Sequence, residues 1–210
     1  MGKNLAKLLS YIFHPLLMPT YGIAIVFYYL PLLSALITPH GQNIVYGIVF
    51  ITTFIFPGAT AFTLLQRGLI SSLEMETITE RRLPFLSTAV YYLIGYYVLK
   101  KIHIPPVFNV IVLGAAVSVL ASVLINLRWK ISIHMIGIGG VAGLMAGLAV
   151  RFGLDLHMPF IAILLLAGLL GTARLKLYSH SPAQVYAGFL TGFASEFFML
   201  VPVKWAAFLS

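Results

Sequence analysis

Apolar runs of about 20 residues recur along the whole chain, and a run of that length is what a helix needs to cross the hydrocarbon core of a bilayer. Of the 210 residues, 60% are hydrophobic and only 9% are charged. A typical soluble domain has about a quarter of its residues charged. Because a soluble core of this size cannot hide so much apolar surface, the sequence predicts an all-α polytopic transmembrane helix bundle.

Seven apolar segments are expected within a single integral membrane domain that covers residues 1–210. The count is six if the short third segment, or the sixth, which begins after Asp155 and His157, does not cross. Residues 1–15 form an amphipathic segment that is predicted to lie in the membrane interface. Pro57 lies inside the second segment and is expected to kink it. The segments are roughly 16–38, 43–65, 84–100, 105–127, 133–151, 157–173 and 182–203.

The chain is strongly basic, with 13 Lys and Arg against 5 Asp and Glu. We interpret this excess as membrane anchoring and contact with anionic lipid headgroups, and not as binding of nucleic acid. With seven spans, nine of the 13 basic residues fall on one side, which the positive-inside rule assigns to the cytoplasm of a bacterial cell with this protein in its inner membrane. These nine are Lys3, Lys7, Arg67, Arg81, Arg82, Arg128, Lys130, Arg174 and Lys176.

Three polar patches interrupt the apolar background, at residues 80–84, at 128–134, and from Arg174 to His180. Two predicted spans separate each patch from the next, so all three are expected on the same face of the membrane. Guanidinium groups match phosphate oxygens, and histidine can act as a nucleophile or a proton donor near neutral pH. The patches therefore predict phosphoryl transfer on a lipid phosphate at the membrane interface, without a metal or another cofactor. The absence of cysteine excludes thiolate catalysis and cysteine metal sites.

The third patch has the most specific spacing. Arg174 is followed after five residues by His180, and His180 after three residues by Gln184. This spacing resembles the third motif of the type 2 phosphatidic acid phosphatase superfamily, which reads Ser-Arg, five residues, His, three residues, Asp. The family includes lipid phosphatases and polyprenyl-diphosphate phosphatases. The resemblance extends over about residues 80–192, and Gln184 stands where the family has its aspartate.

The other two motifs resemble the family less closely. Ser132 and His134 keep the polar positions of the family's Pro-Ser-Gly-His, while its Pro and Gly are replaced by isoleucine. The first motif reads Arg82-Leu83-Pro84 in place of adjacent Arg-Pro, and the upstream position of the family's basic residue holds Glu74 or Met75.

Carried over to these positions, the resemblance implies a lipid phosphate hydrolase that works through a phosphohistidine. His180 would attack phosphorus, and His134 would protonate the leaving alkoxide and then activate water. Gln184 would orient His180 without supplying the negative charge of an aspartate. The implied phosphate-binding residues are Arg174, Arg82, Arg81 and Ser132.

Several of these residues also have purely structural explanations. Ser181-Pro182-Ala183-Gln184 reads as a capping box at the start of the last segment. Arg128 and Lys130 are typical interfacial anchors, and the glutamates at 74, 76 and 80 are expected to pair with nearby arginines. Glu196, in the last segment, is about 18 Å along the helix from Gln184 and is therefore kept outside the predicted site. No role is assigned to His14, His40, His103 or His157.

Two alternatives to the hydrolase stay open. Gln184 and the weak first two motifs favour a non-hydrolytic relative that binds or moves a phospholipid or another anion. Glu196 and Pro57 are also compatible with an unrelated small transporter.

Overall fold

The computed structural model describes residues 1–202, and all of its regular structure is helical, which confirms the predicted all-α class. A 3-10 turn (Pro15–Leu17) joins α1 to α2, and a π-helical turn (Ile51–Ile55) joins α4 to α5. The α-helices are α1 (Lys3–Ile12), α2 (Met18–Tyr29), α3 (Pro31–Ser34), α4 (Pro39–Phe50), α5 (Phe56–Gln66), α6 (Ile78–Lys101), α7 (Pro106–Ile125), α8 (Ile133–Phe152), α9 (His157–Lys176) and α10 (Pro182–Leu200).

Within residues 1–202, five helical stretches are long and apolar enough to cross a membrane, so the chain is an integral membrane protein. They comprise residues Lys3–Tyr29, Pro39–Gln66, Pro106–Ile125, Ile133–Phe152 and His157–Lys176. The third and seventh predicted segments correspond to α6 and α10, which are helices of 24 and 19 residues. The end of the seventh predicted segment, at residue 203, and Lys204 lie outside the described residues.

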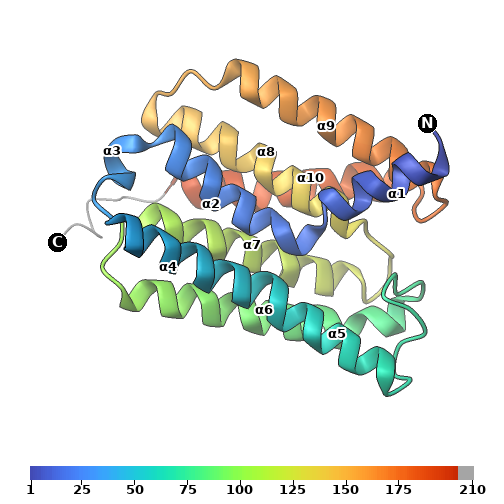
Figure 1. Cartoon of the computed structure of the whole chain (residues 1–210). Coiled ribbons are helices and arrows are strands. Elements are labelled where there is room, and N and C mark those ends of the chain that lie inside the picture. The colour runs from blue at the N-terminus through green and yellow to red at the C-terminus, as the bar shows by residue number, and fades with distance from the viewer. Residues whose placement is uncertain (203–210) are drawn as a thin grey trace.

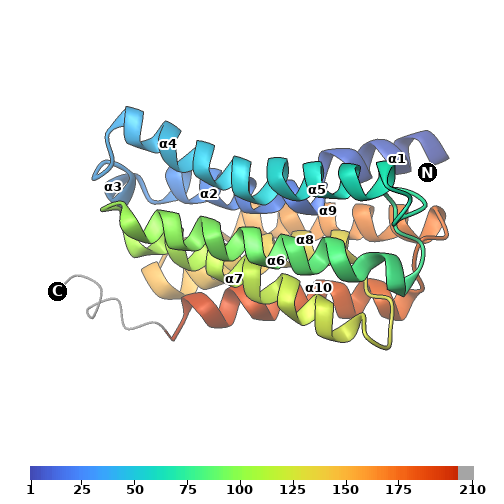
Figure 2. The same ribbon diagram turned by 90° about the horizontal axis from the view of Figure 1, so that it is seen from below.

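The long helices run side by side along one common direction, as two views of the bundle show (Figures 1 and 2). The N-terminus lies at the same end of the bundle as three connections, which are residues 67–77, 126–132 and 177–181 (Figure 1). We call this the loop end. The three polar patches of the sequence therefore share one end, as the counting of spans predicted.

The most extensive helix contact is between α8 and α10. A Cβ atom added at Gly188 would lie 2.6 Å from the carbonyl oxygen of Ser132, and one added at Gly139 would overlap the backbone of Phe189. Glycine is therefore needed where the two backbones touch, as is typical of closely packed membrane helices.

The N-terminal segment is part of the bundle. α1 packs against α9, and its chain continues through the 3-10 turn into α2, so that Lys3–Tyr29 forms one candidate span. Pro57 lies in the first turn of α5, directly after the π-helical turn. A proline without an N–H disrupts α-helical hydrogen bonding, and π-helical turns are one way to absorb that change.

Candidate functional site

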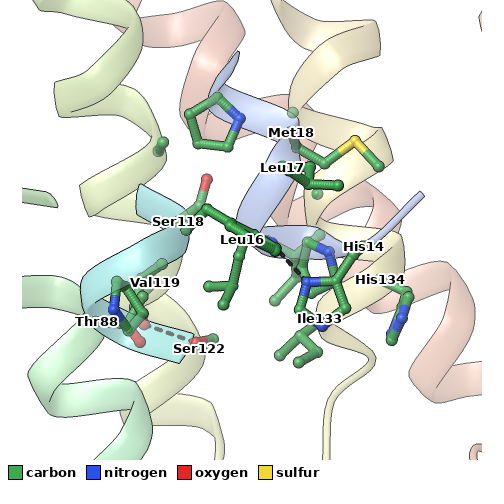
Figure 3. A pocket seen from close by; sticks show the side chains of 18 of the residues that line it. His14, Leu16, Leu17, Met18, Thr88, Ser118, Val119, Ser122, Ile133 and His134 are labelled. Atoms are coloured by element: carbon green, nitrogen blue, oxygen red, sulfur yellow. Dashed lines mark hydrogen bonds between the residues drawn. The ribbon is translucent and has the colours of Figure 1, made fainter. Parts of the chain in front are cut away.

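A cavity of about 520 Å³ opens at the loop end and extends into the bundle. Four charged or imidazole side chains from the three patches line it, namely Arg81, His134, Arg174 and His180. Deeper in, the wall is formed mainly by apolar side chains of α2, α7 and α8, with Glu196 of α10 also in the lining. Figure 3 shows part of this cavity, with His14 and His134 close together and Thr88, Ser118 and Ser122 on another side.

His180 lies in the connection between α9 and α10 and is only 8% exposed. Its Nδ1 atom is 3.2 Å from Oε1 of Gln184, and the backbone N–H of Ser181 donates to the same oxygen at 3.0 Å. An amide oxygen can only accept, so Nδ1 of His180 carries the proton and Nε2 keeps its lone pair. The Gln184 side chain thus selects the tautomer with a nucleophilic Nε2.

Gln184 has this position because it closes a capping box. The Ser181 hydroxyl accepts from the backbone N–H of Gln184, and the Gln184 side chain accepts from the backbone N–H of Ser181. This confirms the capping box predicted from the sequence. One side chain therefore fixes both the start of α10 and the orientation of His180.

The surroundings of His180 are electropositive. Burial, and then the charges of Arg81, Arg174 and Lys130, lower the pKa of His180 to about 3, against the opposing effect of the hydrogen bond to Gln184. The imidazole is therefore neutral at physiological pH. The same cations would attract a bound phosphate.

Arg81 is 3% exposed and is held by two loops. Its Nε donates to the carbonyl of Met75 at 2.8 Å, and Nη1 donates to the carbonyl of Ile131 at 2.9 Å. Arg81 thus ties the connection before α6 to the connection before α8. Its guanidinium still lies in the lining of the cavity.

Arg174, on the last turn of α9, is fixed by the N-terminal helix. Its Nη1 donates to the hydroxyl of Ser10 at 3.2 Å, while its Nε is buried without a partner. Arg174 nevertheless lines the cavity, so its guanidinium group adds a positive charge to the cavity wall.

His134 is also held by Ser10. Its Nε2 lies 3.2 Å from the carbonyl oxygen of Ser10, which can only accept, so Nε2 carries the proton. Nδ1 is left buried and without a partner. The His134 ring stands edge-on to the ring of His14 at a centroid distance of 5.8 Å.

The remaining predicted phosphate-binding residues lie apart from the cavity lining. Arg82 points to the exposed side of α6, one residue from buried Arg81. The Ser132 hydroxyl is buried without a partner and outside the lining, while its backbone N–H donates to the carbonyl of Gln184 at 3.4 Å. The structure therefore brings together Arg81, Arg174, His134 and His180, with Gln184 behind His180.

The acidic residues of the loop end differ in role. Glu80 accepts from the backbone N–H groups of Ser71 and Thr77 and completes a capping box at the start of α6. Within residues 1–202 it forms no ion pair with an arginine, so the predicted pairing is wrong for this residue. Glu74 lines the mouth of the cavity and is close enough to Arg174 to affect it electrostatically.

The residues outside the predicted site that line the cavity include Ser10, His14 and Glu196. Ser10 and His14 are four residues apart in the N-terminal segment, which span counting already places at the loop end. Glu196 was excluded because of its distance from Gln184, but the cavity is long enough to reach it. The sequence thus places Ser10 and His14 at the correct end of the bundle and shows a carboxyl group inside the last segment at Glu196. It does not show how far the cavity extends into the bundle.

The site combines anion donors, a nucleophilic imidazole and a second imidazole with a free nitrogen, above an apolar interior. In the part of the chain that the structure describes, no group of three or more His, Cys, Asp or Glu side chains could hold a metal ion. No protein-family model, curated protein or solved structure matches the chain.

Proposed function

We propose that this protein hydrolyses a lipid or polyprenyl phosphate monoester or diphosphate at the membrane interface, through a phosphohistidine at His180. The observation that carries the proposal is the meeting of Arg81, His134, Arg174 and His180 on one cavity with an apolar interior. The phosphate would bind among the arginines at the mouth, and the lipid chain would extend between the helices.

The arginines supply the affinity for phosphate. Arg174 brings a guanidinium group to the cavity wall, and Arg81 adds a buried positive charge that two backbone carbonyls hold in place. Charge-assisted hydrogen bonds of this type contribute about 1.5–3 kcal/mol each.

In the first chemical step, the lone pair of His180 Nε2 attacks phosphorus. The P–O bond to the lipid breaks, and its electron pair leaves with the alkoxide oxygen. His134 first takes the proton of the phosphate monoanion on Nδ1 and then gives it to this alkoxide. The products are a lipid alcohol and phosphohistidine.

In the second step, His134 Nδ1 takes a proton from water, whose oxygen attacks phosphorus. The P–N bond breaks and its electrons return to His180 Nε2. His134 then returns the proton to the departing phosphate, which restores both neutral rings. Throughout, Nδ1–H of His180 keeps Gln184 Oε1 as its acceptor.

A non-hydrolytic binder of lipid phosphates is the second candidate, and one observation favours it. The acceptor behind His180 is the neutral amide of Gln184 and not a carboxylate. A carboxylate would stabilise the positive charge that develops on the imidazole ring, and an amide does so less. Under this alternative the same cavity would hold the lipid without turning it over.

We further propose seven spans, in a bacterial inner membrane, with the loop end facing the cytoplasm. The support is the alternating course of the helices and the concentration of basic residues at the loop end. The chain has no cysteine, so Tyr178→Cys at an 87% exposed loop position gives a single label site. An impermeant maleimide should label it in inside-out vesicles and not in intact cells, and the reverse pattern would refute the orientation.

The function is tested by phosphate release from a panel of lipid and prenyl phosphates, with purified protein in detergent and a chelator. We expect turnover that the chelator spares and that His180→Ala abolishes, by at least about 10³-fold. Arg174→Gln should also lose most activity, whereas Lys176→Gln, an exposed cation on the same turn, should not.

No turnover over the whole panel would refute the hydrolase. In that case Gln184→Asp separates the two candidates. Activity gained by this variant would indicate a catalytic site limited by the missing charge, and saturable lipid phosphate binding without turnover would support the binder.

A further inference from the structure

Glu196 is an ionisable side chain that the proposed reaction does not use. It lies in the last quarter of α10, is 5% exposed and lines the inner part of the cavity. Its Oε2 has no hydrogen-bond partner, and within residues 1–202 no cationic side chain forms an ion pair with it. An intramembrane carboxyl in this situation indicates function more than stability.

The packing reserves space for this carboxyl. A Cβ atom added at Gly114 of α7 would overlap Oε2 of Glu196, and one added at Gly140 of α8 would lie 3.4 Å from its Cγ. Glycines on both neighbouring helices thus leave room for the side chain where it meets the cavity.

Hydroxyl groups connect this position to the mouth of the cavity. Ser118 and Ser122 follow Gly114 at intervals of four residues on the same face of α7, and both line the cavity, as does Thr88 of α6. Figure 3 shows these three side chains in the wall of the cavity. These three hydroxyl groups therefore line the otherwise apolar part of the cavity between the phosphate site and Glu196.

A carboxyl without a counter-charge in an apolar interior takes up a proton, because burying the ion costs far more. A carboxylic acid has one donor and one acceptor, and a hydroxyl group is complementary to both. A purely hydrocarbon chain in the cavity would leave the carboxyl unsatisfied. The inner end of the cavity is thus suited to a chain that carries a hydrogen-bonding group.

We propose that Glu196 is a specificity subsite that recognises a hydroxyl group in the middle of the ligand's alkyl chain. The proposal rests on the proposed function for the position of the phosphate. Glu196 follows Gln184 by 12 residues, which is about 18 Å along the helix. The preferred ligand is therefore a lipid phosphate whose chain is hydroxylated far from its headgroup.

The test compares oleoyl lysophosphatidate with its 12-hydroxy and 3-hydroxy analogues, by competition binding to the purified protein in detergent. We expect the 12-hydroxy lipid to bind about tenfold more tightly than the unsubstituted lipid, and the 3-hydroxy lipid to show no preference. Glu196→Leu should reduce the 12-hydroxy preference to about one. Glu196→Gln should retain part of it, because a carboxamide also donates and accepts.

An equal preference in the parent protein and in Glu196→Leu would overturn the proposal, as would tighter binding of the 3-hydroxy lipid. If Glu196→Leu does not fold, Gly114→Ala provides the test, because its methyl group would displace the carboxyl and should lower the preference. The headgroup is tested separately with Arg174→Gln. If Arg174→Gln does not change the affinity for these lipids, the proposed phosphate site is refuted. A preference for the 12-hydroxy lipid that is still observed in that case would leave the Glu196 subsite supported.

Discussion

The α8–α10 contact and the α1–α9 contact both border the same cavity but are built in different ways. At the first, glycines bring two backbones together, and the pair carries His134, Gln184 and Glu196. At the second, side-chain and carbonyl groups of one residue, Ser10, hold Arg174 and His134. The first contact depends on the absence of side chains, whereas the second combines apolar packing of Leu9 and Phe13 with single hydrogen bonds of Ser10.

This difference predicts how each contact responds to substitution. Close backbone packing tolerates no added atom, because the neighbouring backbone cannot move by a rotamer change. A hydrogen bond between side chains can be lost while the surrounding helices keep their positions. The α8–α10 contact should therefore control stability, and the α1–α9 contact should tune the site.

Gly192→Ala should have the largest effect. The added methyl group would overlap the carbonyl oxygen of Ile136, so we expect a loss of about 1–3 kcal/mol in the free energy of unfolding. Gly168→Ala on α9 is the matched control, since its methyl group meets no atom within 4 Å. Thermal unfolding in detergent measures both, and the comparison fails if the two variants lose the same stability.

Arg174→Gln should weaken lipid phosphate binding by about tenfold or more, because it removes a charged donor from the cavity wall. Unfolding should change little, since the bond from Arg174 to Ser10 joins only two side chains. Lys176→Gln should leave affinity unchanged. Equal losses for the two variants would show that the effect is one of overall charge.

The sequence predicted the helices and their shared end well, because apolar length and turn position are local properties. The capping box at Ser181 and Gln184 was predictable for the same reason. The choice between Arg81 and Arg82 was not, because adjacent residues on a helix point about 100° apart and only the packing of α6 decides which is buried. The roles of Ser10 and His14 depend on contacts with His134 of α8 and Arg174 of α9, which are 124 and 164 residues from Ser10 along the chain.

Ser10→Ala should have a smaller effect than Arg174→Gln. It removes the hydroxyl that accepts from Arg174 and leaves the backbone carbonyl that accepts from His134. The guanidinium keeps its charge and its place on α9 when this one bond is lost, so lipid phosphate affinity should fall only a few fold. A loss as large as that of Arg174→Gln would mean that the hydroxyl, and not the guanidinium, makes the main contact with phosphate.

The pH dependence of stability tests the electropositive site directly. Burial, and then the charges of Arg81, Arg174 and Lys130, lower the pKa of His180 from 6.5 to about 3 in the folded protein. Between these two values the unfolded chain takes up a proton that the folded chain does not, so stability falls as pH decreases from about 6.5 toward 3. His180→Gln removes this contribution and leaves all other titrating groups in place.

The melting temperature of the parent protein should therefore decrease more between pH 7 and pH 4 than that of His180→Gln. Bound inorganic phosphate should reduce the difference, because an anion beside the ring stabilises its protonated form and raises the pKa of His180. Parallel curves for the two proteins, with and without phosphate, would show that His180 is not buried among cations in the folded state. Such a result would remove the electrostatic basis for phosphate binding at this end of the bundle.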